Sequence, residues 1–446
     1  MKYGEPDIQV LYNIYKQHPV ISTDSRAIKK NSIFFALKGD NFNGNTFVSE
    51  AFSLGAAYAI VDDADYVINK NCLLVKNSLK ALQELASEHR KHLHIPVIGI
   101  TGSNGKTSTK ELLYVVLKQR YNTLATIGNL NNHIGVPLTI LNITNETEIA
   151  IIEMGANHPG EIKMLCDIAQ PNYGIITNIG KAHLDGFGSF QNIIDTKKAL
   201  YNTLKNNKGI AFVNFNDPLL ISLSQMNNCI YYGKNRLLFC RGKIINNEFL
   251  LKIHWDSNSP DKIPEEAKTI QTQLIGNYNF NNILAAICTG LFFKINPIQI
   301  KQAIENYTPS MLRSQFKETA YNKIILDAYN ANPVSTKAAL INFISLKLNN
   351  KIVILGDMFE LGNAAIKEHK NIIQLVKKQD FSHSFFIGEV YYNLLMNKEE
   401  NKINNITPFK DTASAMQFFK DNSLKNASIL IKGSRGMKLE LLVNLF

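Results

Sequence analysis

The chain has 446 residues, of which 45% are apolar, and its formal net charge at pH 7 is +11. Because single cores stop growing near roughly 250 residues, this length predicts about three domains. No apolar run is long enough to span a membrane, and no run of Lys and Arg exceeds two residues. These patterns argue against a membrane protein and disfavour nucleic acid as a partner.

The cysteines and the first residues indicate the compartment. Five cysteines are scattered without Cys-x-x-Cys pairs, which is typical of reduced, buried thiols. The opening MKYGEPDIQV has no apolar stretch of the kind found in secretory signals. We therefore expect a cytoplasmic protein.

Residues 1–94 form the first predicted domain, with short buried strands at 33–37, 59–61 and 73–75 and a helix over 78–90. The segment HRKHLHIP, which begins in the last turn of this helix, contains His89, His92 and His94. A solvated linker is favoured over a metal site there, because no fourth ligand has suitable spacing.

Two loops of this first domain are rich in small polar residues. The segment 22–28 reads STDSRAI, and the segment 36–45 reads ALKGDNFNGN. Such loops are either ordinary turns or a surface that reads anions and hydroxyls. Their composition alone does not choose between the two.

The second predicted domain, residues 95–310, opens with a strand at 97–100, the loop TGSNGKT at 101–107 and an amphipathic helix. Gly102 and Gly105 permit backbone angles that point N–H groups at a phosphate chain on the helix N-terminus. Lys106 supplies a charge for the outer phosphates, and the Thr107 hydroxyl suits Mg²⁺. Ile100 replaces the first glycine of the strict phosphate-loop spacing, so this is a variant loop that predicts nucleoside triphosphate binding.

Further strands at 149–154, 174–178 and 209–214 continue a strand–helix alternation that predicts a parallel sheet. Glu153 ends an apolar run, where an unpaired carboxylate is costly, so a metal or a buried cation is expected beside it. His183 follows the next strand and is equally compatible with a structural role and a ligand role. Lys197 and Lys198 would ordinarily lie on the solvated face of a helix.

The end of this domain has a different pattern. Residues 236–273 alternate around Asn246-Asn247 and predict a small antiparallel flap. A helix then begins near Asn279, with four asparagines in six residues at its start. These side chains either cap the helix or read an adenine edge.

Residues 311–446 form the third predicted domain, with strands at 324–327, 352–355, 384–387 and 429–431. Helices are predicted over 333–346, 365–378 and 412–422. Polar clusters follow three of the strands, at 327–333, 356–362 and 432–440. Their shared position at one sheet edge predicts a site that faces the nucleotide.

The motifs together resemble the Mur ligase family. They occur in order over nearly the whole chain, and they are TDSRAI, FFALKGDNFNGN, TGSNGKT, GNLNNHIGVPLT, IEMGANHPGEI, TNIGKAHLDGFGS, GNYNFNN, LDAYNANP, LGDMFELG and KGSRGMKLE. The resemblance implies an α/β fold of three domains: a small UDP-binding N-terminal domain, a central P-loop ATPase domain with a parallel sheet and β flap, and a Rossmann-like C-terminal domain.

The resemblance also implies an activity. ATP would phosphorylate the peptide carboxylate of UDP-MurNAc-tripeptide, and the amine of D-Ala-D-Ala would attack the acyl phosphate to form an amide. YNANP and GNLNNxIGVPLT favour this member of the family. The alternatives are a ligase that adds the third residue, for which a DNPR-like motif is missing, and a P-loop switch. A monomer is expected, and the third residue of the acceptor stays open.

Site residues follow from the same resemblance. Metal ligation is implied for Thr107, Glu153, His183 and a carbamylated Lys197, with Mg²⁺ as the metal. Lys106, Glu153, His183, Lys197 and Arg313 are the implied catalytic residues. ATP contacts are implied for Gly102, Ser103, Asn104, Gly105, Lys106, Thr107, Ser108, Asn279, Asn282, Arg313 and Asp327. Substrate contacts are implied for Ser25, Arg26, Asn131, Asn132, Asn330, Asn332 and Arg435.

Two departures from the family pattern affect these assignments. Tyr278 stands where the adenine motif usually has histidine, and a tyrosine ring can still stack on a base. The sequence KKAL replaces the usual lysine-glycine-glutamate, which leaves open whether Lys197 or Lys198 is modified.

Overall fold

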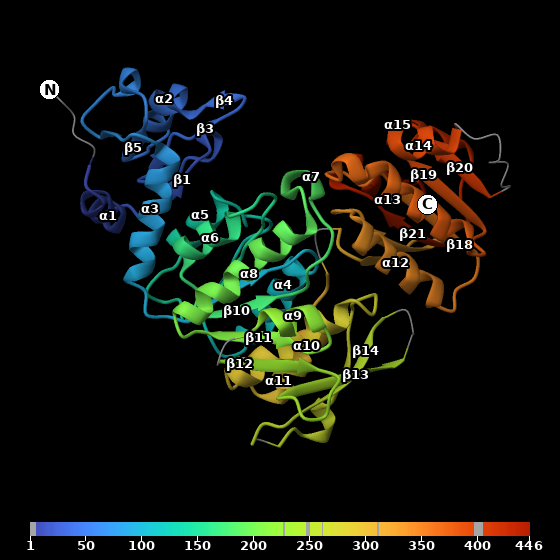
Figure 1. Ribbon diagram of the computed structural model, residues 1–446. Coiled ribbons are helices and arrows are strands. Elements are labelled where there is room, and N and C mark those ends of the chain that lie inside the picture. The colour runs from blue at the N-terminus through green and yellow to red at the C-terminus, as the bar shows by residue number, and fades with distance from the viewer. Residues whose placement is uncertain (1–5, 226–227, 247–249, 261, 310–311, 397–404) are drawn as a thin grey trace.

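The computed structural model describes residues 6–225, 228–246, 250–260, 262–309, 312–396 and 405–446. It has three lobes, each built around its own sheet (Figure 1). We name them the N-terminal lobe (residues 8–91), the central lobe (97–305) and the C-terminal lobe (315–445). The predicted three-domain α/β architecture is confirmed. The boundaries at 94/95 and 310/311 stay predictions, and the second lies outside the described residues.

The N-terminal lobe contains a parallel sheet in the order β1-β2-β5-β6 and a separate two-stranded antiparallel pair, β3 with β4. The predicted strands and the long helix are present. The elements are α1 (Ile8–Gln17), β1 (Ile21–Ser22), β2 (Ile33–Phe35), β3 (Lys38–Gly39), β4 (Phe42–Asn43), α2 (Val48–Ser53), β5 (Tyr58–Val61), β6 (Cys72–Leu74) and α3 (Ser78–Lys91).

The predicted solvated linker after α3 is wrong for its first residues. His89 and Arg90 belong to the last turn of the helix and are buried. The imidazole Nε2 of His89 lies 2.9 Å from the carbonyl oxygen of Ile143, and its ring meets Tyr15 edge-on at 5.0 Å. The polar residues of this segment predicted a solvated linker. His89 and Arg90 are buried instead, because residues far along the chain pack against them.

The central lobe has nine strands in the order β15-β14-β13-β12-β11-β10-β7-β9-β8. The strands from β8 to β13 run parallel, and β14 and β15 are antiparallel to their neighbours. The predicted flap is therefore an extension of the main sheet. Asn247 of the predicted turn lies outside the described residues. The strands are β7 (Val97–Thr101), β8 (Thr123–Ala125), β9 (Ile149–Glu153), β10 (Tyr173–Ile176), β11 (Ile210–Asn214), β12 (Cys229–Gly233), β13 (Cys240–Asn246), β14 (Lys252–Ser257) and β15 (Thr269–Gln271).

Helices cover both faces of this sheet, as expected for parallel strands. Helices α5, α6 and α8 share one apolar cluster with the sheet, and α4, α10 and α11 share another. The helices are α4 (Lys106–Leu117), α5 (Gly135–Leu141), α6 (Glu161–Ala169), α7 (Leu184–Phe187), α8 (Phe190–Asn206), α9 (Pro218–Leu223), α10 (Asn279–Phe292) and α11 (Pro297–Glu305).

The C-terminal lobe has a six-stranded sheet in the order β16-β17-β21-β18-β19-β20, parallel except for β16. The predicted strands and helices are present, and β16, β20 and α14 are additional. The elements are β16 (Gln315–Glu318), β17 (Lys323–Asp327), α12 (Pro333–Ser345), β18 (Lys351–Gly356), α13 (Ala365–Lys377), β19 (His383–Ile387), α14 (Glu389–Met396), β20 (Ile406–Phe409), α15 (Thr412–Asp421) and β21 (Ser428–Lys432).

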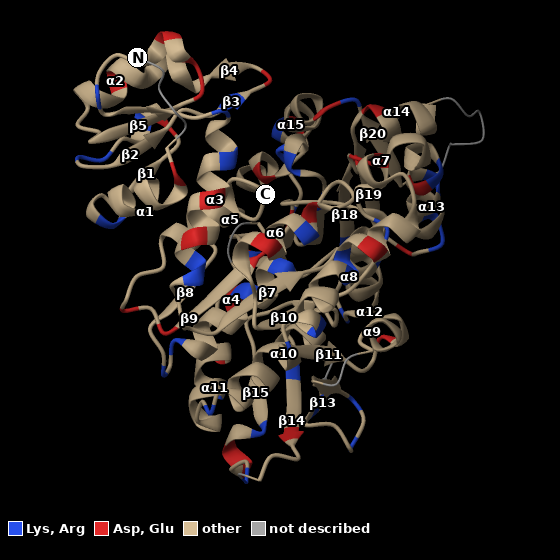
Figure 2. Cartoon of the chain, turned by 60° about the vertical axis from the view of Figure 1, so that its left-hand side comes forward, with Lys and Arg blue, Asp and Glu red and all other residues tan. Residues whose placement is uncertain are grey.

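Charged residues lie on all three lobes, with both signs interspersed (Figure 2). The expectation that the chain does not bind nucleic acid stays a prediction. Within the described ranges, every helix is too short or too polar to cross a bilayer.

Candidate active site

The glycine loop joins β7 to α4 with a geometry that only glycine accommodates. Gly102 has φ +149°, and a Cβ there would lie 2.0 Å from Thr177 Oγ1. Gly105 has φ +79° and precedes the first turn of α4. The Lys106 ammonium donates to the Gly102 carbonyl over 2.8 Å. Burial lowers the pKa of Lys106, and the negative charge of a bound phosphate would counter this effect by stabilising the ammonium.

Glu153 lies at the carboxyl end of β9, beside the first turn of α4. Its Oε1 accepts from Thr107 Oγ1 at 3.1 Å and from Asn131 Nδ2 at 2.7 Å. Its Oε2 is buried and has no hydrogen-bond partner among the described residues. An open, buried carboxylate oxygen beside a threonine hydroxyl suits a hard cation such as Mg²⁺.

Lys197 is buried within α8 and is only 2% exposed. Its ammonium lies 5.8 Å from the centre of the Phe187 ring. Burial, together with the nearby charge of Lys106, lowers the pKa of Lys197 to about 7. Lys198, by contrast, is half-buried. The solvated position expected from the local pattern is therefore wrong for Lys197, whose amine is partly neutral near pH 7.

His183 directly precedes α7 and has φ +51°, and its imidazole Nδ1 pairs with the Glu360 carboxylate of the C-terminal lobe. This hydrogen bond lowers the pKa of Glu360. The loop around His183 also touches the C-terminal lobe where a Cβ at Gly362 would meet Asp185. His183 therefore lies where two lobes meet.

The asparagines at the start of α10 do not act as helix caps. Asn279 Nδ2 donates to the Ile275 carbonyl at 2.8 Å, and Asn282 Nδ2 donates to Asn279 Oδ1 at 2.9 Å. Asn282 Oδ1 also accepts from Thr109 at 3.2 Å and lies against Gly105. Tyr278, which replaces the family histidine, bonds through its hydroxyl to Ser314 at 2.6 Å.

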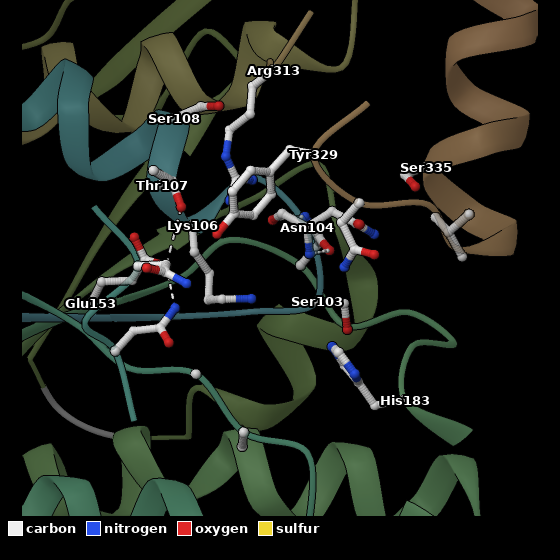
Figure 3. A pocket seen from close by; sticks show the side chains of 18 of the residues that line it. Ser103, Asn104, Lys106, Thr107, Ser108, Glu153, His183, Arg313, Tyr329 and Ser335 are labelled. Atoms are coloured by element: carbon white, nitrogen blue, oxygen red, sulfur yellow. Dashed lines mark hydrogen bonds between the residues drawn. The ribbon is translucent and has the colours of Figure 1, made fainter. Parts of the chain in front are cut away.

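The C-terminal lobe contributes a second group of charges. Asp327 pairs with Lys432 at 2.7 Å, and the same ammonium donates to the Asn330 carbonyl at 3.1 Å. The Arg313 guanidinium lies 3.9 Å from the centre of the Tyr329 ring. Figure 3 shows the two side chains next to each other. Arg313 Nε is buried without a partner among the described residues, so this cation has capacity to bind an anion.

Most of these groups line one cavity of about 550 Å³ between the central and C-terminal lobes. Figure 3 shows Lys106, Thr107 and Glu153 close to Arg313 and Tyr329, with His183 on the far side of Ser103. The predicted site residues that line it are Ser103, Asn104, Gly105, Lys106, Thr107, Ser108, Asn131, Asn132, Glu153, His183, Asn279, Asn282, Arg313, Asp327 and Asn330.

The cavity does not bring every predicted residue together. Gly102, Lys197 and Asn332 lie outside its lining, although Asn332 Nδ2 reaches Asn104 Oδ1 at 2.8 Å. Ser25 and Arg26 form a turn in the N-terminal lobe, where Arg26 is exposed and pairs with Asp24. Arg435 pairs with Glu440 at 3.0 Å.

Several lining residues are absent from the sequence predictions. They include His133, Asn157 and His158 from the central lobe, and Tyr329 and Lys432 from the C-terminal lobe. Tyr329 and Lys432 lie within motifs that follow predicted strands, so their position was a usable signal. In the described part of the chain no cluster of three His, Cys, Asp or Glu side chains could hold a metal. A metal at Glu153 would thus draw ligands from substrate phosphates as well.

Comparison with known proteins defines the class. The model of the Mur ligase middle domain matches residues 100–290, that of the Mur ligase glutamate ligase domain matches 312–435, and that of the Mur ligase family catalytic domain matches 19–100. The three matches follow one another along the chain and each falls on one lobe.

Full-length relatives are also similar. The UDP-N-acetylmuramoyl-tripeptide–D-alanyl-D-alanine ligase of Bacillus subtilis is 34% identical over 95% of this chain and 92% of its own length. A crystal structure of MurF from Acinetobacter baumannii is 27% identical, with a TM-score of 0.85 over 100% of this chain and 99% of that one. The MurF ligase of Thermotoga maritima in complex with ADP is 26% identical, with a TM-score of 0.81 over 96% and 97%. This chain belongs to the Mur ligase family.

Proposed function

We propose that this chain is an ATP-dependent amide ligase that adds D-Ala-D-Ala to UDP-MurNAc-tripeptide in peptidoglycan precursor synthesis. The tripeptide carboxylate attacks the γ-phosphorus of ATP, and ADP leaves. The dipeptide amine then attacks the acyl carbon, a proton leaves the nitrogen, and phosphate departs as the amide forms. Phosphorylation is needed because the oxide of a carboxylate is a poor leaving group.

One observation carries this proposal. The cavity between two lobes combines the glycine loop, the open carboxylate of Glu153 and Arg313, whose Nε has no hydrogen-bond partner among the described residues. It does so in a chain that is similar over 95% of its length to a UDP-N-acetylmuramoyl-tripeptide–D-alanyl-D-alanine ligase. The cavity is large enough for a nucleotide and the reacting ends of two substrates.

In this proposal ATP binds between the central and C-terminal lobes, with contacts from both. The loop N–H groups, Lys106 and Arg313 bind the phosphates, where charge develops during transfer. Asn279 and Asn282 bind the adenine, and Asp327 accepts from the ribose. Gly102, Ser103, Asn104, Gly105 and Ser108 shape the loop.

Thr107, Glu153, His183 and Lys197 would hold Mg²⁺, directly or through phosphate and water. The ion would neutralise phosphate charge and polarise the transferred phosphoryl group. We assign the carbamate to Lys197 over Lys198, because burial and a pKa of about 7 leave its amine partly neutral. That amine attacks CO₂, the N–C bond forms, and an N–H proton passes to solvent.

The remaining assignments complete the proposal. Ser25 and Arg26 contact the UDP moiety, and Asn132, Asn330 and Arg435 contact the peptide substrates. Asn131 and Asn332 would act beside them, although each already has a partner in Glu153 and Asn104. Domains at 1–94, 95–310 and 311–446, a monomeric state and a cytoplasmic location stay predictions.

The test measures phosphate release from ATP with UDP-MurNAc-tripeptide, with and without D-Ala-D-Ala, and the product mass. Release that requires both substrates, with a product heavier by the dipeptide less water, is the expected result. Phosphate release that is indifferent to both substrates would contradict the proposal and favour a P-loop switch.

A further inference from the structure

Lys110 is a buried cation in the second turn of α4, outside the set of residues assigned above. Its side chain is 1% exposed, and its Nζ donates to the carbonyl oxygens of Thr126 at 2.6 Å and Gly128 at 3.2 Å. Glu111 lies 2.9 Å from the same ammonium. A buried ammonium is costly unless its donors are satisfied, so α4 holds these carbonyls firmly in place.

The segment that Lys110 holds contacts Glu153 at two points. The backbone N–H of Glu153 donates to Thr126 Oγ1 at 2.9 Å, and Asn131 Nδ2 donates to Glu153 Oε1 at 2.7 Å. The carbonyl of Asn131 in turn accepts from the N–H of Gly155 at 2.8 Å. Both the backbone and the carboxylate of Glu153 therefore depend on the segment 126–131.

The same helix reaches Glu153 by a second, direct route. Thr107, one turn before Lys110, donates to Glu153 Oε1 at 3.1 Å. Lys110 acts on the opposite side, through the carbonyls of the segment 126–131. Together the two routes fix Oε1 and leave Oε2 free, which is the oxygen available to a cation.

We propose that Lys110 is a positioning residue that holds the Glu153 carboxylate in its metal-binding orientation through the segment 126–131. This inference rests on the proposed function, because it assumes that Glu153 binds a divalent cation with the nucleotide. Lys110 does not line the cavity, so it acts through other residues. Groups that orient a metal ligand from outside typically affect metal affinity by about 10- to 100-fold.

The test compares Lys110→Met with Lys118→Met, an exposed lysine at the other end of α4. Binding of Mn²⁺ to the complex of each protein with ADP is measured by electron paramagnetic resonance. Lys110→Met should bind Mn²⁺ roughly 10- to 100-fold more weakly, with kcat reduced and KM for D-Ala-D-Ala changed less than about twofold. Lys118→Met should bind Mn²⁺ as the wild type does.

Wild-type Mn²⁺ affinity in a folded Lys110→Met protein would overturn the inference. An equal loss in Lys118→Met would also overturn it. Should Lys110→Met fail to fold, Thr126→Val removes the hydroxyl that accepts from the Glu153 backbone and should weaken Mn²⁺ binding in the same direction; unchanged affinity there counts against the inference. If the wild type itself neither binds Mn²⁺ with ADP nor forms product, the proposed function fails instead.

Discussion

The two junctions of the central lobe are built differently. At the N-terminal junction, Leu82 and Leu85 of α3 belong to the same apolar cluster as Val136 and Ile140 of α5. The C-terminal lobe has its own two clusters, to which the central lobe contributes Ile275 and the partly buried Leu250. Figure 1 shows α3 alongside the central lobe, and the C-terminal lobe on the other side, next to α7.

Polar contacts follow the same division. Arg90 is buried at the N-terminal junction and donates to the carbonyls of Ala169 at 2.9 Å and Gln170 at 3.0 Å. The C-terminal junction relies on pairs between loops, such as Asn332 with Asn104. Breaking one such bond costs about 1 kcal/mol of free energy. Separating the N-terminal lobe costs more, because it exposes a continuous apolar core to water. The cavity therefore lies at the junction that is easier to open.

The largest effect is expected from a substitution of Lys197, which lies outside the lining of the cavity and takes no part in either junction. Lys197→Ala should reduce turnover by on the order of 100-fold or more, because the proposed carbamate can no longer form. Added acetate or formate should restore part of the activity. Steady-state phosphate release with both substrates measures the loss and the rescue.

Lys198→Ala is the matched control for this prediction, since Lys198 is the half-buried neighbour. It should keep wild-type turnover within about twofold. Full activity of Lys197→Ala would contradict the assignment, and a loss confined to Lys198→Ala would move the modification to that residue.

The N-terminal junction should respond strongly to loss of its buried arginine. Arg90→Ala leaves several carbonyls without a charged donor and should destabilise the junction by roughly 3 kcal/mol. The amides of α3 should exchange hydrogen faster than in the wild type, whereas the amides of α13 should exchange at the same rate. Arg120→Ala is the control, because Arg120 is exposed and donates to the Lys294 carbonyl. Unchanged exchange in Arg90→Ala would mean that the apolar core alone holds this junction.

The C-terminal junction should lose less stability when a polar contact across it is removed. Asn332→Ala removes both the cap of α12 and the bond to Asn104, so it should cost about 1 kcal/mol in unfolding free energy. Asn332→Ser retains a cap and should be more stable than the alanine variant. Both variants should raise KM for ATP by about fivefold, the equivalent of one hydrogen bond between lobes. Wild-type KM in Asn332→Ser would show that this bond does not support nucleotide binding.

The smallest expected effect is a loss of folding stability at acidic pH. Burial lowers the pKa of His89 below its ordinary value of 6.5, against a backbone hydrogen bond to Ile143 that raises it. Tyr12, Tyr15 and His92 also face this ring. The unfolded chain takes up a proton below pH 6.5 while folded His89 resists it, so stability should fall as pH drops below 6.5 and stay constant above.

The loss between pH 7.5 and 5.5 should be below about 1.4 kcal/mol, the limit for one pH unit of differential protonation. Melting temperatures at the two pH values measure it. His89→Gln should reduce this pH dependence, and His94→Gln, at an exposed position, should not. Equal pH dependence in all three proteins would assign the acid sensitivity to other groups.

Much of the fold was predictable because its signals are local. The alternation of apolar runs with amphipathic segments located β7, β9, β17 and β18 to within two residues, since strand and helix periods are properties of consecutive side chains. The edge strands β16 and β20 escaped prediction. They are short and partly exposed, so their apolar pattern is weak.

The site also contains features that its local sequence predicted and features that depend on distant residues. The glycine loop was evident from its own residues, because Gly102 and Gly105 meet a backbone requirement that is set within a few positions. The partners of Glu153 were not evident, because Thr107 and Asn131 lie 46 and 22 residues away. A carboxylate at a strand end predicts that a partner exists without saying which.

The sequence by itself determined the phosphate-binding loop, the order of the elements and the residues at the strand ends. Only the tertiary structure decided that Lys197, Lys110 and Arg90 are buried and what each of them contacts. Helical spacing puts Lys110 on the same face as Leu113 and Leu117, but a lysine is ordinarily expected to be solvated unless a distant segment covers it. Burial depends on that distant segment, and the packing of segments is a property of the folded chain alone.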